Sequence, residues 1–120
     1  AVRRALRLAR GFAGDAGLGS TDTDRLAVIG EEWVANLVEH GRLPSGDRIG
    51  LRLALRPEGL VCITATDAGR PFDPRGVVFA GPDPERGGGV GLELIRAWTR
   101  IRFYGRRRGL NRLILEMPLA

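Results

Sequence analysis

Two polar residues four positions apart, Glu32 and Asn36, form the first candidate site. They occur in the sequence GEEWVANLVEHG, and in a helix this spacing places both side chains on one face, one turn apart. A carboxylate can act as a general base, and an amide oxygen suits a hard cation such as Mg²⁺. His40 continues the same line by another turn. The alternative interpretation is an ordinary solvated helix edge.

The second candidate site is Asp67 in the sequence ITATDAGRPFDP. A carboxylate at the end of a buried strand can accept a hydrogen bond from an exocyclic amine. Gly69 would then let the backbone approach a flat ring closely, because glycine has no side chain. The alternative is a simple turn, since Asp-Ala-Gly is favourable turn chemistry.

The third candidate site is the glycine-rich sequence ERGGGVGLELIRAW. Gly87, Gly88, Gly89 and Gly91 lead directly into a predicted helix. Backbone amides that glycine exposes at a helix N-terminus can bind an anion. The dinucleotide-binding fingerprint does not fit, because no strand directly precedes these glycines. The alternative is a flexible lead-in to a capped helix.

The hydrophobic pattern predicts the helices and strands that must position these sites. We expect helices at about 1–12, 21–40 and 92–100, and strands at 49–55, 60–66, 101–104 and 112–117. Thr21 or Asp22 is the expected N-cap of the second helix. This order predicts an α+β fold, a two-layer sandwich of about three helices on a mostly antiparallel sheet of about four to five strands.

The composition limits the class of protein. The chain has 120 residues, which suits a single domain over residues 1–120. All 19 basic residues are arginine, so the Walker-type phosphate loop, which needs lysine, is excluded. A single histidine excludes multi-histidine metal sites. No apolar run approaches the roughly 20 residues that span a bilayer, so we expect no membrane partner.

The only cysteine, Cys62, lies in the apolar run LVCI, so we expect a buried and unreactive thiol. The absence of paired cysteines suits a reducing compartment. The sequence also has no basic stretch followed by an apolar segment of the signal-peptide type. Together these features favour a cytoplasmic location.

The arginines give a formal charge of +5, which raises the question of nucleic-acid binding. They are spread along the chain, and few aromatic residues are present for stacking, so we expect no nucleic-acid partner. The arginines near residues 3–10 and 106–108 are interpreted as solvated faces. The alternative is an electrostatic patch for an acidic partner protein.

In their order and spacing, the three candidate sites resemble the N, G1 and G2 boxes of the GHKL (Bergerat-fold) ATPase superfamily. EEWVANLVEHG resembles the pattern E-L-x-x-N-A-x-x-H-G, DAGRPFDP resembles D-x-G-x-G-F-D-P, and GGGVGLELI resembles G-G-x-G-L-x-L-I. The resemblance is closest to anti-sigma factor serine/threonine kinases of the RsbW and SpoIIAB type. It covers about residues 4–119.

The resemblance implies a role for each matching residue. Glu32 would be the catalytic base, and Asn36 would hold Mg²⁺. Asp67 would bind the adenine amine, and Gly69 would let the base lie close. Nucleotide contacts are also implied for residues of the third box: Arg86, Gly87, Gly88, Gly89, Gly91 and Leu92. Asn111 stands where the family often has threonine near the adenine.

The resemblance also implies a function. The chain would be an ATP-binding, Mg²⁺-dependent regulatory kinase that phosphorylates a Ser or Thr of a STAS-type anti-anti-sigma protein. It would sequester a sigma factor, and a homodimer is among the expected assemblies. Two alternatives stay open. One is a nucleotide-binding or protein-interaction module of the same fold with weak catalysis, and the other is the ATP-binding domain of a sensor histidine kinase.

Overall fold

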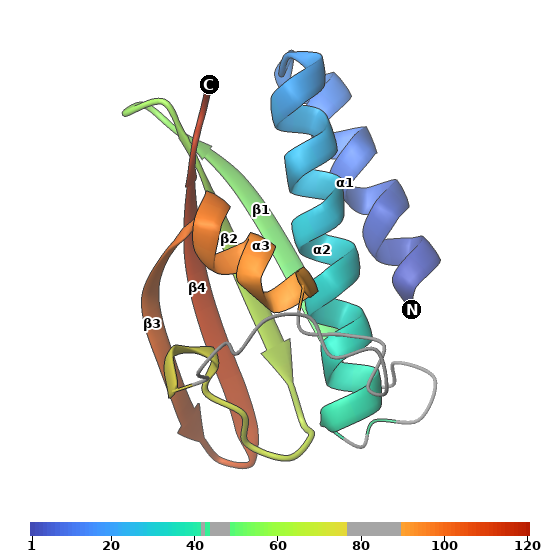
Figure 1. Cartoon of the computed structure of the whole chain (residues 1–120), viewed down its shortest axis with the longest axis vertical. Coiled ribbons are helices and arrows are strands. Elements are labelled where there is room, and N and C mark those ends of the chain that lie inside the picture. Colours follow the sequence, from blue (N-terminus) through green and yellow to red (C-terminus); the bar gives the residue numbers. More distant parts are fainter. Residues whose placement is uncertain (42, 44–48, 77–89) are drawn as a thin grey trace.

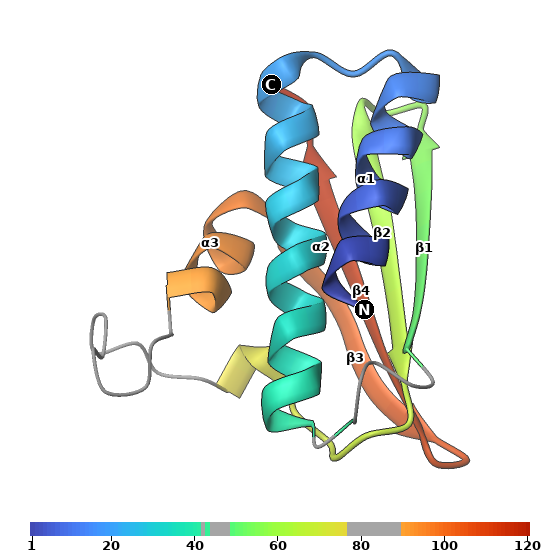
Figure 2. The same ribbon diagram turned by 90° about the vertical axis from the view of Figure 1, so that its right-hand side faces the viewer.

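The computed structural model describes residues 1–41, 43, 49–76 and 90–120 of the chain. The elements follow in the order α1 (Val2–Ala16), α2 (Ser20–His40), β1 (Ile49–Arg56), β2 (Leu60–Asp67), the short 3-10 helix η2 (Pro74–Gly76), α3 (Val90–Trp98), β3 (Arg100–Arg107) and β4 (Leu110–Pro118). The α-helices lie on one side of a four-stranded sheet, with α2 between α1 and α3 (Figures 1 and 2). This arrangement confirms the predicted α+β sandwich.

The sheet has the strand order β1-β2-β4-β3, and every neighbouring pair is antiparallel. The turn between β3 and β4 consists of Arg108 and Gly109, with φ angles of 54° and 79°. Two consecutive residues with positive φ form the tight turn whose twist matches a hairpin. Because this turn needs only two residues, β3 and β4 pair along more of the chain than the predicted strands 101–104 and 112–117.

The core lies between the helices and one face of the sheet. Every second residue of the central strands is buried there: Val61, Ile63 and Ala65 on β2, and Leu113, Leu115 and Met117 on β4. On α2, Leu26, Ile29, Trp33 and Leu37 form an apolar stripe that is buried in this core. Cys62 is half-buried and has the opposite parity. The prediction of a buried thiol is therefore wrong, because the alternation of β2 places Cys62 on the face without helices.

α1 packs closely on α2 through small residues. Ala5, Ala9 and Ala13 are buried and recur every four positions, which places them on one helix face. α1 runs past its predicted end near residue 12. It ends where Gly17 adopts a φ of 72° and the next amide, of Leu18, donates to the Ala13 carbonyl oxygen at 2.9 Å. This is the glycine-dependent helix end that a left-handed residue allows.

The ends of α2 and α3 also differ from the prediction. α2 begins at Ser20 with Gly19 as N-cap, so Thr21 and Asp22 are not caps. Asp22 is instead buried, and its Oδ1 accepts a hydrogen bond from the Ala120 backbone amide at 2.9 Å. α3 begins at Val90, two residues earlier than predicted, and ends at Trp98. None of the described helices is both long and apolar enough to cross a membrane.

Candidate functional site

Asp67, the last residue of β2, is a buried carboxylate that accepts hydrogen bonds from described residues through one of its two oxygens. It is only 3% exposed. Its Oδ2 accepts two hydrogen bonds, from the Gly69 backbone amide at 2.9 Å and from the Asn111 Nδ2 at 3.0 Å. No described residue donates to Oδ1. The carboxylate is therefore held through one oxygen and keeps the other as a hydrogen-bond acceptor.

Asn111 and Arg106 hold this carboxylate and the following turn in place. Asn111 lies opposite Asp67 in the β2–β4 register and is 1% exposed. Its Nδ2 also donates to the Gly69 carbonyl oxygen at 3.0 Å. Arg106 donates to that same oxygen and to the Asn111 Oδ1, both at 3.0 Å. Sequence reasoning singled out Asn111 but missed Arg106, because Arg106 was grouped with its neighbours as a solvated residue.

Gly69 is in close contact with the end of α2. A Cβ at this position would lie 2.7 Å from the Gly41 carbonyl oxygen and 2.9 Å from the Leu43 Cγ. The next amide, of Arg70, donates to the Gly41 oxygen at 2.9 Å. The need for glycine at position 69 therefore has a cause within the protein, and the close approach of a base stays a prediction.

Glu32 and Gly91 are brought together by the packing of α3 against α2. Gly91 lies in the first turn of α3, and a Cβ added there would overlap the Glu32 carboxylate, with its Cδ only 2.6 Å away. Only glycine leaves room for the carboxylate in this position. Burial raises the pKa of Glu32, and repulsion from the neighbouring Glu31 raises it further. A carboxylate with a raised pKa is a stronger proton acceptor when it is ionised.

Two buried nitrogen atoms on α2, the Asn36 Nδ2 and the Trp33 Nε1, have no hydrogen-bond partner in the described part of the chain. An unpaired buried donor costs about 1–3 kcal/mol, so each atom fits a site that a ligand completes. Rotation of the Asn36 amide exchanges its nitrogen and oxygen, and the oxygen is a ligand that Mg²⁺ accepts. The residues present therefore fit a Mg²⁺ ion that takes its other ligands from phosphates and water.

Phe72 links the segment after β2 to α2 and to the sheet. Its ring centroid lies 6.3 Å from those of both Trp33 and His40, and the His40 ring is stacked at 19°. Its backbone amide donates to the Tyr104 hydroxyl oxygen at 2.7 Å. Burial raises the pKa of Tyr104, while the hydrogen bond from Phe72 acts in the opposite direction. Through these contacts, Phe72 fixes the segment after β2 against the end of α2 and against β3.

The remaining residues of the third box are only partly described. Leu92 is half-buried and packs against the core cluster. Arg86, Gly87, Gly88 and Gly89 lie outside the described residues, so their predicted contacts with a nucleotide stay predictions. Among the residues that are described, no group of three or more His, Cys, Asp or Glu side chains is placed to hold a metal ion.

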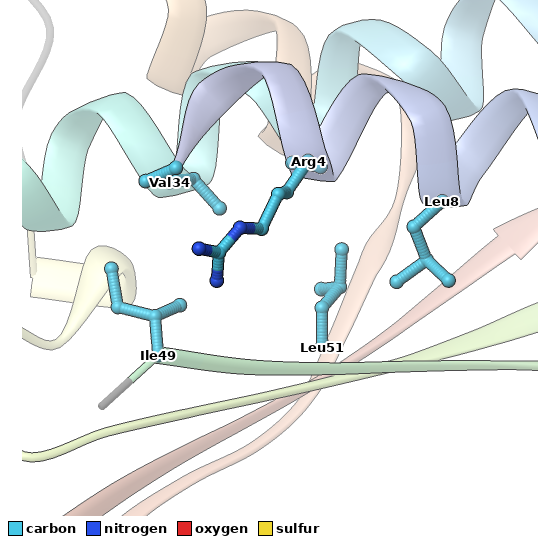
Figure 3. Close-up of a pocket in the computed structure, with 7 residues that line it drawn as sticks. Arg4, Leu8, Val34, Ile49 and Leu51 are labelled. Carbon is cyan, nitrogen blue, oxygen red and sulfur yellow. The ribbon is translucent and has the colours of Figure 1, made fainter. Parts of the chain in front are cut away.

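A separate pocket of about 380 Å³ lies between α1, α2 and β1 (Figure 3). Its walls are mainly apolar, and the Arg4 guanidinium extends between Val34 and Ile49. None of the candidate site residues that the structure describes lines it. The candidate site is therefore distinct from this pocket and lies on the α3 side of α2.

The fold and the site together define a nucleotide-binding domain of the GHKL type. Its helices cover one face of an antiparallel sheet, and a hydrogen-bonded carboxylate lies at the end of a central strand. A second carboxylate and an amide lie on the long helix. Residues 1–116 match the family of histidine kinase-like ATPase domains. The chain therefore belongs to this family, and ATP is the nucleotide that the family indicates. No significant match was found among curated proteins or among solved structures.

Proposed function

We propose that the chain binds Mg²⁺ and ATP along one side of α2 and acts as a protein kinase of the anti-sigma factor type. It transfers the γ-phosphate to a Ser or Thr of a STAS-type anti-anti-sigma protein and sequesters a sigma factor when that protein is not available. Family membership supports the nucleotide. The likeness of the three boxes to RsbW and SpoIIAB supports the partners, a homodimer and a cytoplasmic location.

The observation that carries the nucleotide part of the proposal is the state of Asp67. Its Oδ2 is occupied by the donors of Gly69 and Asn111, and no described residue donates to Oδ1. The exocyclic amine of adenine is a hydrogen-bond donor and complements this free oxygen. Guanine has a carbonyl oxygen at the corresponding ring position, which would face the carboxylate as a second acceptor. The site therefore favours ATP over GTP.

The position of Glu32 and Asn36 on α2 supports the proposed location of the triphosphate. Gly69 contacts Gly41 at the end of α2, and residue 32 is nine positions earlier. At a rise of about 1.5 Å per residue, this separation is about 14 Å along the helix. It has the scale of an extended nucleoside triphosphate. A base bound at Asp67 would thus direct its phosphates toward Glu32 and the start of α3.

In the transfer step, the hydroxyl oxygen of the partner's Ser or Thr attacks the γ-phosphorus, the bond to the β-phosphate oxygen breaks, and ADP leaves. Glu32 accepts the hydroxyl proton. Asn36 would hold Mg²⁺ through its side-chain oxygen, and the bound ion supplies charge neutralisation at the phosphates. Arg86, Gly87, Gly88 and Gly89 belong to the proposed phosphate contacts.

Titration calorimetry with ATP, with and without Mg²⁺, tests the binding part. We expect ATP binding to be tightened by Mg²⁺ in the wild type, and Asn36→Ala to remove this Mg²⁺ dependence. Equal tightening in the variant would contradict the metal assignment. GTP that binds as tightly as ATP would contradict the role of Asp67.

Transfer of labelled phosphate to the STAS-type protein tests the catalytic part. We expect Glu32→Gln to bind ATP but to lose transfer, whereas the neighbouring Glu31→Gln control keeps it. Full transfer by Glu32→Gln would remove Glu32 as the base. ATP binding without any transfer by the wild type would instead assign a nucleotide-dependent interaction module.

A further inference from the structure

The face of the sheet opposite the helices collects arginines from three of its four strands. The alternation of side chains and the strand register place on it Arg52 and Arg56 of β1, Arg100, Arg102 and Arg107 of β3, and Arg112 of β4. We call this surface the outer face. In the sequence these residues are scattered, and only the antiparallel register brings them together.

Most of the positive charge on the outer face is uncompensated. Arg102 donates to the Glu116 carboxylate at 3.1 Å. The other arginines of this face form no ion pair within the described part of the chain. Glu58, in the turn between β1 and β2, is the one further acidic residue around the hollow described next. The described outer face is therefore strongly cationic.

The outer face is hollowed over its two central strands, and the hollow has both uncharged and charged lining residues. A hollow of about 510 Å³ lies over the central strands, with Cys62 and Thr64 of β2 and Ile114 of β4 among the residues that line it. These three residues are half-buried. Arg56 lines the hollow from β1 and Arg102 from β3, while β4 contributes Arg112 and Glu116. On the β3 side, Phe103 is 45% exposed, with its ring over Gly105.

We propose that the outer face docks an acidic, amphipathic helical segment of a partner protein. The apolar side of the segment would enter the hollow, and its flanking carboxylates would pair with the arginines of the edge strands β1 and β3 and with Arg112 of β4. The dimensions agree, because three strand spacings of about 4.8 Å separate these edge strands by about 14 Å, and a helix with its side chains is about 10–12 Å across. This inference is independent of the nucleotide site.

The composition of the outer face favours this occupant over two others. Sheet surfaces that bind single-stranded nucleic acid stack bases on aromatic side chains, but the residues of β2 and β4 on this face include no aromatic residue. Phe103, on the edge strand, is the one exposed aromatic ring of the described outer face. A second copy of the chain would present the same arginines, so that two outer faces would repel each other.

Fluorescence anisotropy with a labelled synthetic peptide tests the proposal. The probe is an 18-residue helical peptide with leucines on one face and glutamates on both flanks. The test variant is Arg52→Gln/Arg112→Gln, and the control is Arg3→Gln/Arg7→Gln, which removes the same charge from exposed positions of α1. We expect a micromolar dissociation constant that weakens at high salt, at least tenfold weaker binding by the test variant and less than a twofold change in the control. Bound peptide should also slow alkylation of Cys62.

Several results would overturn the proposal. Absence of peptide binding at 100 µM protein would do so, as would equal effects of the two double variants, which would indicate unspecific attraction. Equal affinity for a scrambled peptide of the same composition would exclude an amphipathic helix as the occupant. Tighter binding of single-stranded oligo(dT), also lost in Arg52→Gln/Arg112→Gln, would assign the outer face to nucleic acid instead.

Discussion

Replacement of Gly91 by alanine should separate the position of the Glu32 carboxylate from the stability of the fold. The added Cβ would lie 2.6 Å from the Glu32 Cδ, whereas ordinary carbon contacts are about 3.5–4.0 Å. The carboxylate must therefore retreat by about 1 Å. The obstacle is the end of a flexible side chain, and alanine forms helix better than glycine by up to about 1 kcal/mol. We therefore expect the melting temperature to stay equal or to rise.

The catalytic effect should be large. A displacement of about 1 Å of a positioned catalytic group costs about 100-fold in rate, so Gly91→Ala should reduce phosphate transfer to the STAS-type protein by this factor. The ATP affinity should change by only a few fold, because the proposed base site at Asp67 is about 14 Å from Glu32 along α2. The assay is the initial rate of transfer at saturating ATP, with the dissociation constant from calorimetry.

Two comparisons complete this test. Gly14→Ala on α1 makes the same chemical change in a helix where nothing lies within 4 Å, and it should leave transfer unchanged. In the background of Glu32→Gln, the Gly91→Ala change should cause no further loss, since the two act through one group. A Gly91→Ala protein with the full transfer rate would refute the role of the Glu32 position. An additive loss in the double variant would show that Gly91 acts without Glu32.

Three further predictions concern single residues of the site. Asn111→Ala removes the side-chain donor that hydrogen-bonds to Asp67 and to the Gly69 carbonyl oxygen. It should lower the free energy of unfolding, measured by chemical denaturation, by about 1–3 kcal/mol and should weaken ATP binding about tenfold. An unchanged ATP affinity would contradict the role of Asn111 in positioning Asp67. Glu32→Gln should raise the melting temperature at pH 7. The pKa of Glu32 is raised in the folded state, so between the unfolded and folded pKa values the folded state binds more protons, and the stability of the wild type falls as the pH rises through this window. The difference in melting temperature between the variant and the wild type should therefore shrink toward pH 4 in a thermal-shift series. A difference that grows toward pH 4 would contradict the effect of burial on Glu32. Asn36→Leu should leave the ligand-free protein at least as stable as wild type in urea, because its Nδ2 has no described partner; a loss of several kcal/mol would show that Asn36 has a structural hydrogen bond.

The sequence predicted the layers of the fold well, because their signals are local. Leu26, Ile29, Trp33 and Leu37 recur at helical spacing and are all buried. The alternating residues Ile49, Leu51 and Leu53 are partly buried against the same core. The helix ends were less predictable. Asp22 is a residue type that often caps helices, but its carboxylate accepts a hydrogen bond from the backbone amide of Ala120 at the other end of the chain. No local sequence pattern predicts a contact between residues so far apart in the chain.

Part of the geometry of the candidate site could be predicted from the sequence. The spacing of four placed Glu32 and Asn36 on one face of a helix, and the end of a strand singled out Asp67, which the structure buries. Their roles toward a nucleotide stay predictions. The side chain of Arg106 was missed because its function depends on the face of β3 from which it projects. Its neighbour Arg107 has the opposite parity and belongs to the outer face. A bulge between Ile101 and Phe103 shifts the register of β3 and so decides which of the later arginines faces the helices. The residue types of this strand do not predict the bulge.

A crystal structure of the protein with Mg²⁺ and a non-hydrolysable ATP analogue tests most directly whether Asp67 binds the adenine base. We expect the purine amine within hydrogen-bonding distance of the Asp67 Oδ1, with the Asn111 and Gly69 hydrogen bonds to Oδ2 kept and the phosphates near Glu32 and Asn36. A base bound elsewhere, for example in the pocket between α1 and β1, or a direct contact from another protein donor to Oδ1, would contradict this assignment.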